Sequence, residues 1–259
     1  MKTDYDFSGI LLASDWDGTL SVEGTVSEKN CRAIEEFQRG GGYFTVVSGR
    51  TPSYLSERFA GFSPNTYTVG LNGAMIEDLR TGETLYHGFC DAGMLKPLRA
   101  VLQAADGILQ VTLYTEDTTY VFSPEELVRF LPELIPEKVY KTVFLTKSAS
   151  DAEGLLTLAR SVPYNGYEIV RSFATGVELL SEKSGKGVAL SRLKEKLGLR
   201  YALAVGDFEN DISLLRAADI GYAVKDAAPA LLAVADRVIC PAKDGAIAAI
   251  LSDIKKRGI

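Results

Sequence analysis

Short apolar runs alternate with helical segments at both ends of this 259-residue chain, and this alternation limits the fold more than any other feature. Ile10–Ala13 is an apolar run with the length of one buried strand. A helix is expected over 28–38, because Ser27 is a good N-cap and apolar residues recur along one face. Strands separated by helices form βαβ units, in which the strands are parallel. The alternation therefore predicts an α/β fold with a parallel sheet.

The same pattern covers a first and a last stretch of the sequence. Further strands are expected at 43–47, 67–71, 201–205, 220–224 and 237–240, and further helices at 54–60, 185–197, 211–218, 229–235 and 245–255. Together these elements predict a Rossmann-like, doubly wound parallel sheet as the core, formed by residues 1–86 and 181–259.

Between these stretches the pattern changes. Residues 110–114 and 119–122 alternate in polarity on either side of a turn-rich segment, which is typical of a hairpin. Helices are expected at 93–104, 125–130 and 152–160. We therefore expect an inserted α+β domain over 87–180.

The composition limits the compartment and the partners. A net charge of -6 argues against a protein that binds nucleic acid electrostatically. No apolar run has the length of a membrane span, and the polar residues 1–7 do not resemble a secretory signal. Cys31, Cys90 and Cys240 are scattered, as reduced thiols of a cytoplasmic protein would be, and the single histidine, His87, is expected to be structural. We expect a monomer or a homodimer.

Polar residues follow four of the expected strands. Because the carboxyl ends of parallel strands meet at one edge of the sheet, these residues are expected to lie close together. Any one of them could simply cap a helix, but four together indicate a functional site. The four endings are Asp15 with Asp17, Ser48-Gly49-Arg50, Asn72-Gly73, and the run from Gly206 to Asp211.

The acidic residues among these endings indicate a metal. Asp15 and Asp17 stand two apart and can point to the same side of the strand, so their charges require a shared proton or a cation. With Asp207 and Asp211 they form an all-oxygen set that suits Mg²⁺. These segments contain no histidine or cysteine, which argues against zinc.

Groups that could bind phosphate stand in the same segments. Ser48 supplies a hydroxyl, and Gly49 supplies a backbone N–H at a strand-to-helix turn. Lys186 lies between two glycines at the start of an expected helix, where the helix dipole disfavours a cation. This position favours a functional role for Lys186.

These segments resemble the four ordered motifs of the haloacid dehalogenase superfamily. The order, the spacing and the insertion between the second and third motifs are similar to the Cof-type subfamily, which has a C2-class cap. The resemblance therefore implies that the inserted domain over 87–180 is a cap that determines substrate specificity. The matching segments are Asp15-Trp16-Asp17-Gly18-Thr19, Val47-Ser48-Gly49-Arg50, Lys186 and Gly206–Asp211, and Asn72-Gly73-Ala74 and Asp244-Gly245 also fit subfamily patterns.

The resemblance implies a phosphatase that acts through an aspartyl-phosphate intermediate. By family analogy Asp15 is the nucleophile, and Asp17 protonates the leaving group and then activates water. Mg²⁺ would be held by the Asp15 carboxylate, the Asp17 carbonyl and Asp207, with Asp211 in or just outside the coordination shell. The phosphoryl oxygens would be bound by Ser48, Gly49, Arg50, Lys186 and Asn210.

The implied substrate is a small phosphorylated metabolite, with sugar phosphates favoured. Two alternatives stay open: a phosphosugar mutase on the same scaffold, and a non-catalytic protein that binds or senses a phosphorylated metabolite. Two residues depart from the subfamily pattern. Trp16 replaces a smaller apolar residue and is expected in the core, and Asp226 stands where asparagine is frequent.

Overall fold

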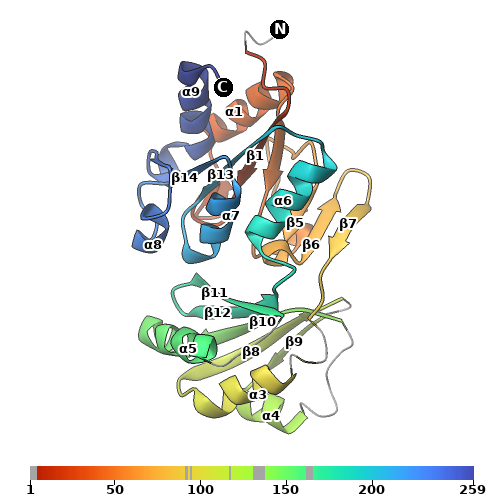
Figure 1. The fold of residues 1–259 in the computed structure, drawn as a ribbon, viewed down its shortest axis with the longest axis vertical. Helices are drawn as coiled ribbons and strands as arrows, with labels where there is room; N and C mark the ends of the chain where they lie inside the picture. Colours follow the sequence, from red (N-terminus) through yellow and green to blue (C-terminus); the bar gives the residue numbers. More distant parts are fainter. Residues whose placement is uncertain (1–4, 91–92, 94, 117, 131–137, 162–165) are drawn as a thin grey trace. The chain divides into compact units, whose positions relative to one another are not determined.

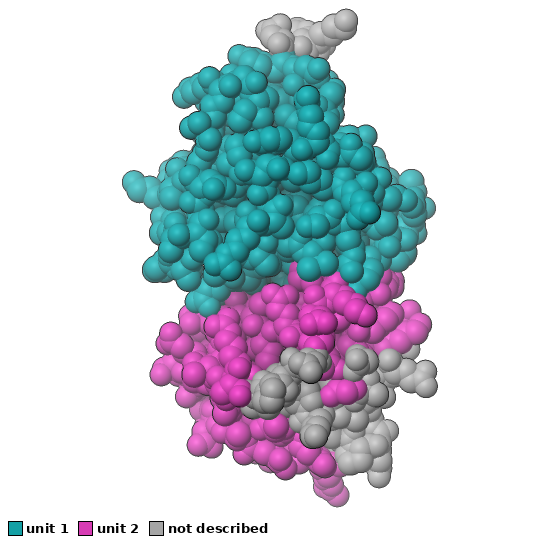
Figure 2. All heavy atoms as spheres, viewed as in Figure 1, with its two compact units in different colours: residues 1–86, 186–259 teal, residues 87–185 magenta. Residues whose placement is uncertain are grey.

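The structure is a computed structural model that describes residues 5–90, 93, 95–116, 118–130, 138–161 and 166–259. The chain divides into two compact units (Figure 2): unit 1 comprises residues 1–86 and 186–259, and unit 2 comprises residues 87–185. The chain returns to unit 1 at Lys186 rather than at residue 181, because strand β12 (Gly176–Ser181) pairs within the sheet of unit 2.

Unit 1 is built on a five-stranded parallel sheet with the order β15-β14-β13-β1-β4. Strands β1 and β13 pair with Ile10 opposite Tyr201, and β4 pairs with the other edge of β1 with Leu11 opposite Tyr43. All neighbouring pairs run parallel, which confirms the predicted α/β class. The strands are β1 (Ile10–Ser14), β4 (Tyr43–Val46), β13 (Tyr201–Gly206), β14 (Ile220–Ala223) and β15 (Arg237–Val238).

The sheet is doubly wound. Helix α1 (Glu28–Arg39) leads from β1 to β4, whereas α7 (Ile212–Ala217) leads from β13 to β14 in the opposite direction across the sheet. Right-handed crossovers therefore place these helices on opposite faces (Figure 1). Helix α1 packs on α9 (Ala246–Arg257), and α7 packs on α6 (Lys186–Lys196). The direction of winding reverses between β1 and β13, which is where ligands bind in open α/β sheets.

The strand expected at 67–71 differs from the prediction. It is β5 (Thr68–Gly70), which pairs antiparallel with β6 (Met75–Asp78) in a three-stranded sheet completed by β7 (Glu83–His87). A single parallel bridge between Val47 and Val69 connects it to the chain beyond β4. The strand itself is confirmed, but its main pairing is antiparallel, because the short connection after β5 returns the chain as a hairpin. Strand pairing is not visible in the polarity of β5 alone.

The helix expected over 54–60 begins and ends earlier, as α2 (Pro52–Ser56). Thr51 is its N-cap, since the Thr51 hydroxyl accepts a hydrogen bond from the Tyr54 N–H, and Pro52 occupies the first turn. A threonine followed by proline is a recognisable helix start that the apolar pattern obscured. Unit 1 also contains β2 (Ser21–Val22), β3 (Thr25–Val26) and α8 (Pro229–Leu232), which is shorter than the expected 229–235.

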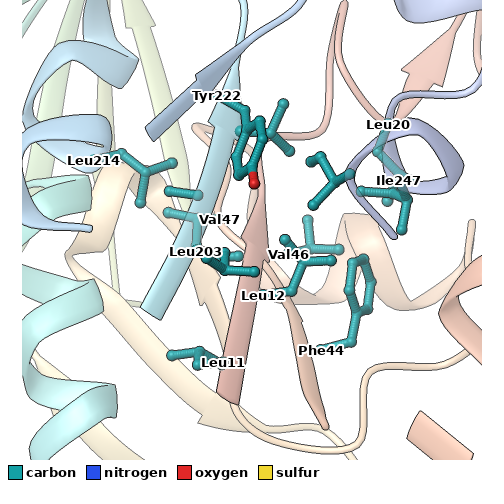
Figure 3. Packing of buried hydrophobic residues seen from close by; sticks show 14 of the residues in the cluster. Leu11, Leu12, Leu20, Phe44, Val46, Val47, Leu203, Leu214, Tyr222 and Ile247 are labelled. Atoms are coloured by element: carbon teal, nitrogen blue, oxygen red, sulfur yellow. The ribbon is translucent and has the colours of Figure 1, made fainter. Parts of the chain in front are cut away.

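The core of unit 1 fills both sides of the parallel sheet (Figure 3). All five residues of β1 are buried, because helices cover both faces. Leu214 of α7 and Ile247 of α9 belong to the same apolar cluster as Leu12 of β1. Trp16 is 1% exposed and packs against Phe59 and Phe62, which confirms its expected place in the core.

Unit 2 is an antiparallel sheet with helices on one face. Its order is β11-β12-β10-β8-β9, and the expected hairpin is β8–β9, with Leu113 opposite Tyr120. Leu98, Phe144, Leu155 and Leu179 contribute to its separate core, so it is an α+β unit as predicted. The remaining elements are β8 (Ile108–Thr115), β9 (Thr119–Phe122), β10 (Val139–Thr146), β11 (Tyr167–Phe173), α3 (Leu95–Ala104), α4 (Pro124–Phe130) and α5 (Ala149–Ser161).

The helix expected over 93–104 includes residue 94, which lies outside the described residues. Tyr140 Oη lies 3.0 Å from Nδ1 of His87, so the single histidine is tied to the sheet of unit 2. Within the described ranges, none of the helices combines the length and the apolar character that a membrane span requires.

Candidate active site

The acidic residues lie where the winding of the sheet reverses. Asp15 follows β1 directly, and its N–H donates to the Val205 carbonyl at 2.9 Å, which extends the pairing of the two central strands to their carboxyl ends. Asp207 follows β13 at the same edge. Parallel pairing therefore brings together two carboxylates that are far apart in the sequence.

Lys186 lies between two of the carboxylates. It is the first residue of α6 and is 1% exposed. Its Nζ donates to Asp15 Oδ1 at 2.6 Å and to Asp211 Oδ1 at 2.5 Å. Burial alone would lower the pKa of Lys186, but the charges of Asp15 and Asp211 outweigh it and raise that pKa above its usual value. The two ion pairs account for a lysine at the disfavoured end of a helix.

Asp15, Asp207 and Asp211 form an acidic cluster, in which one oxygen from each lies within 4.8 Å of the others. Burial, reinforced by the charge of Asp211, raises the pKa of Asp15 well above its usual range. The same two causes raise the pKa of Asp207 to about 6. Three carboxylates thus face one buried ammonium group, and the excess negative charge favours a further cation.

The carboxylate oxygens of this cluster are the kind of ligand that Mg²⁺ prefers.

The backbone around Asp207 is tightly packed. The Gly18 backbone lies so close to Asp207 that a Cβ there would be 2.3 Å from Oδ2, and Gly18 has a φ of +77°. Glycine is therefore required at this position. Thr19 donates to the other Asp207 oxygen at 3.3 Å, a role the sequence did not signal beyond its place in the motif.

Asp211 uses its two carboxylate oxygens differently from the other two acids. Its Oδ2 accepts hydrogen bonds from the N–H groups of Asp207 and Phe208, at 3.0 and 3.2 Å, while Oδ1 accepts from Lys186. A Cβ on Gly206 would lie 2.4 Å from Oδ2, so the backbone closes tightly around this buried carboxylate. Asp211 thus shapes the loop after β13 and holds the lysine.

The Asp17 carboxylate lies apart from the acidic cluster and pairs with Arg50. Arg50 Nε donates to Asp17 Oδ2 at 2.9 Å, and Nη2 donates to Oδ1 at 3.2 Å. The Asp17 side chain is 55% exposed. Two parallel hydrogen bonds from one guanidinium fix the direction of the carboxylate. Arg50, expected among the phosphate-binding residues, thus contacts Asp17 in this structure.

The remaining polar endings are linked through Asn72. Ser48 is 1% exposed, its hydroxyl accepts from the Arg50 N–H at 3.1 Å, and its carbonyl accepts from the Asn72 N–H at 2.8 Å. Asn210 Nδ2 donates to Asn72 Oδ1 at 3.3 Å. The structure therefore connects Ser48, Asn72 and Asn210, three polar endings that the sequence placed on one edge.

Asp226, which stands where the subfamily frequently has asparagine, has a structural role. Its Oδ1 accepts from the Ala242 N–H at 3.0 Å, at the first residue of the 3-10 turn Ala242–Asp244. The Asp244 carbonyl in turn accepts from Lys29 Nζ at 2.7 Å. Asp226 therefore joins the end of β14 to the turn before α9.

Known proteins resemble the chain over nearly its whole length. The family model of haloacid dehalogenase-like hydrolases matches residues 12–251. The phosphatase YwpJ of Bacillus subtilis is 27% identical over 267 residues, which cover 88% of this chain and 93% of that protein.

Two solved structures share the fold. A haloacid dehalogenase-like hydrolase from B. subtilis has a TM-score of 0.79 at 24% identity, covering 93% of this chain and 98% of that chain. The HAD subclass IIB sugar phosphatase BT4131 has a TM-score of 0.73 at 22% identity, covering 96% and 98%. Because the family model spans most of the sequence, the chain belongs to the haloacid dehalogenase-like hydrolases.

Proposed function

We propose that the protein is a Mg²⁺-dependent phosphomonoester hydrolase that acts through an aspartyl-phosphate intermediate on small phosphorylated metabolites, with sugar phosphates as the favoured class. The observation that carries the proposal is the buried ammonium of Lys186, which lies between Asp15 and Asp211 next to Asp207. A phosphoryl group needs positive charge beside its nucleophile, and in a protein whose net charge is -6 Lys186 and a cation held by the acidic cluster would supply it.

Asp15 is the proposed nucleophile. Lys186 holds Oδ1 and so orients the carboxylate, and we assign the attack on phosphorus to Oδ2. The new Oδ2–P bond forms as the bond from phosphorus to the ester oxygen breaks. The leaving alkoxide keeps the electron pair of that bond and requires a proton.

Asp17 is the proposed acid and base. In the first step it gives its proton to the leaving oxygen. In the second step it takes a proton from water, which attacks phosphorus, breaks the Oδ2–P bond and releases inorganic phosphate. Arg50 holds both Asp17 oxygens in this structure, so the Asp17 side chain must leave Arg50 to carry the proton.

Asp15, Asp207 and the backbone carbonyl of Asp17 are the proposed Mg²⁺ ligands. Asp211 lies just outside the coordination shell in this assignment, because its oxygens already accept from Lys186 and from two backbone N–H groups. Bound Mg²⁺ would supply positive charge that offsets the acidic cluster and the phosphate.

Ser48, Gly49, Lys186 and Asn210 are the proposed contacts to the phosphoryl oxygens. Lys186 supplies charge, and the other three supply neutral hydrogen-bond donors. Arg50 joins them in this proposal once it separates from Asp17. Unit 2 is the proposed specificity domain, and a cytoplasmic monomer or homodimer remains our expectation.

Replacing Asp15 with asparagine tests the proposal, because it removes the nucleophile with little change in volume. We expect turnover of p-nitrophenyl phosphate with Mg²⁺ to fall by about a thousandfold or more, and EDTA to abolish wild-type turnover. Asp226→Asn is the matched control, since asparagine can still accept from the Ala242 N–H, and it should keep the wild-type rate. Unchanged turnover by a folded Asp15→Asn protein would sink the proposal.

Product analysis separates the hydrolase from the mutase. With a sugar phosphate as substrate, a hydrolase releases inorganic phosphate, whereas a mutase yields an isomeric sugar phosphate.

A further inference from the structure

We infer that Asn72 is a positioning residue of the phosphate site: its left-handed turn holds the Asn210 amide and the Ser48–Gly49 backbone in the orientation that receives the phosphoryl group. The inference rests on the proposed phosphatase function. It concerns a residue outside the proposed set of catalytic, metal and phosphate contacts.

The turn after β5 has an unusual backbone. Leu71, Asn72 and Gly73 have φ values of 49°, 54° and 97°, so three consecutive residues adopt positive φ. Asparagine and glycine tolerate this region, but leucine rarely occupies it. Leu71 is 1% exposed and Asn72 is 2% exposed, so the strained turn is also buried. Such strain persists only where the surrounding structure holds it, and it concentrates at functional sites.

Hydrogen bonds attach this turn to the segment that follows β4. The Leu71 N–H donates to the Arg50 carbonyl at 2.9 Å, and the Asn72 N–H donates to the Ser48 carbonyl at 2.8 Å. A Cβ on Gly70 would lie 2.4 Å from Cδ of Pro52, so the two segments are in close contact. The turn therefore sets the course of the Ser48–Arg50 backbone.

The Asn72 side chain reaches the other wall of the site. Its Oδ1 accepts from Asn210 Nδ2 at 3.3 Å. Its Oδ1 and Nδ2 each lie 3.4 Å from the position that a Cβ on Gly49 would take. Asn210 Nδ2 carries two hydrogens. When one of them is donated to Asn72, the plane of the amide is set and the second hydrogen has a defined direction. The Asn72 side chain thus orients the Asn210 amide, while the Asn72 backbone N–H holds the Ser48 carbonyl and so fixes the peptide plane that carries the Gly49 N–H.

Asn72→Gly is the informative substitution, because glycine accepts the positive φ and only the side-chain amide is lost. We expect the KM for p-nitrophenyl phosphate and the inhibition constant for inorganic phosphate each to rise about tenfold. The matched control is Asn65→Gly. The Asn65 amide joins Phe44 and Gly42 at the opposite end of β4, so its loss should lower the melting temperature and leave KM unchanged.

A double-mutant cycle with Asn210→Ala identifies the route of the effect. If Asn72 acts partly through Asn210, Asn72→Gly should raise KM less in the Asn210→Ala background than in the wild type. Fully additive effects, or a folded Asn72→Gly protein with wild-type KM and phosphate inhibition, overturn the inference.

The two proposals fail in distinguishable ways. If the wild-type protein lacks turnover, the proposed function fails, and binding of inorganic phosphate to wild type and Asn72→Gly in the presence of Mg²⁺, measured by calorimetry, still tests the positioning role. In that measurement a tenfold weaker affinity of the variant supports the role, and equal affinity overturns it.

Discussion

Replacing Lys186 with methionine removes the buried ammonium group and keeps a long, unbranched side chain. The change leaves the carboxylates of Asp15 and Asp211, which are 7% and 0% exposed, without their shared cation. Removal of one partner of a buried ion pair costs about 3–5 kcal/mol, because the other charge remains buried. We expect the free energy of unfolding of unit 1 to fall by about this amount at about pH 8 in EDTA.

The loss should depend on pH. Burial and the charge of Asp211 raise the pKa of Asp15 above 3.8, and Lys186 opposes this shift, so its removal raises the pKa further. A carboxyl group with a raised folded-state pKa binds a proton more tightly in the folded state. Its destabilising effect therefore builds up as the pH rises from the unfolded-state pKa to the raised folded-state pKa, and it disappears as the pH falls back through that interval. The difference in the free energy of unfolding between the wild type and Lys186→Met should therefore shrink as the pH is lowered from about 8 to about 5.

Urea unfolding followed by tryptophan fluorescence measures this effect in unit 1 alone. Trp16 is the single tryptophan of the chain, and it is buried against Phe59 and Phe62. Linear extrapolation of the transition gives the free energy of unfolding. Lys194→Met is the control, because Lys194 lies on the same helix and forms a partly exposed ion pair with Asp219, which is worth at most about 1 kcal/mol.

A second variant tests whether the charges are the cause. Adding Asp211→Asn to Lys186→Met restores the charge balance, and the asparagine oxygen can still accept from the loop N–H groups, so the double variant should lose less than the sum of the single losses. Equal losses for Lys186→Met and Lys194→Met, or a Lys186→Met loss that does not change with pH, would refute the reasoning.

Two further predictions follow from the acidic side chains of unit 1. Because the pKa of Asp207 is raised to about 6, Mg²⁺ must displace a proton at lower pH, so the apparent affinity of the protein for Mg²⁺ should fall below about pH 6. Calorimetry in buffers of different ionisation enthalpy measures the proton release, and equal affinity at about pH 5 and about pH 7 contradicts the prediction. Hydrogen bonds from Arg80 hold the pKa of Asp78 below 3.8, so the stability it contributes is present above its unfolded pKa and is lost as the pH falls. Asp78→Asn should therefore reduce the acid-induced drop in the urea midpoint, and an unaltered drop would show that this ion pair does not stabilise the fold.

Local sequence patterns predicted much of the fold of unit 1. The run Ile10–Ala13 indicated a strand buried on both faces, and Ser27 indicated a helix start, where its hydroxyl accepts from the Asn30 N–H at 3.2 Å. Both signals act within one turn or one strand, so they can be recognised without knowledge of distant contacts. The helix at Pro52–Ser56 was misplaced although its capping signal was present in the sequence.

The sequence by itself also determined which polar residues end the strands, because those residues follow the apolar runs directly. Tertiary structure alone decided how they pair. Lys186 is 171 positions from Asp15 and meets its carboxylate only because α6 begins beside the end of β1. The ion pair between Asp17 and Arg50, the antiparallel pairing of β5 and the contact of Asn72 with Asn210 are likewise contacts between separate segments. Polarity patterns record whether a side chain is buried, whereas the partner of a buried charge depends on which segments the sheet places side by side.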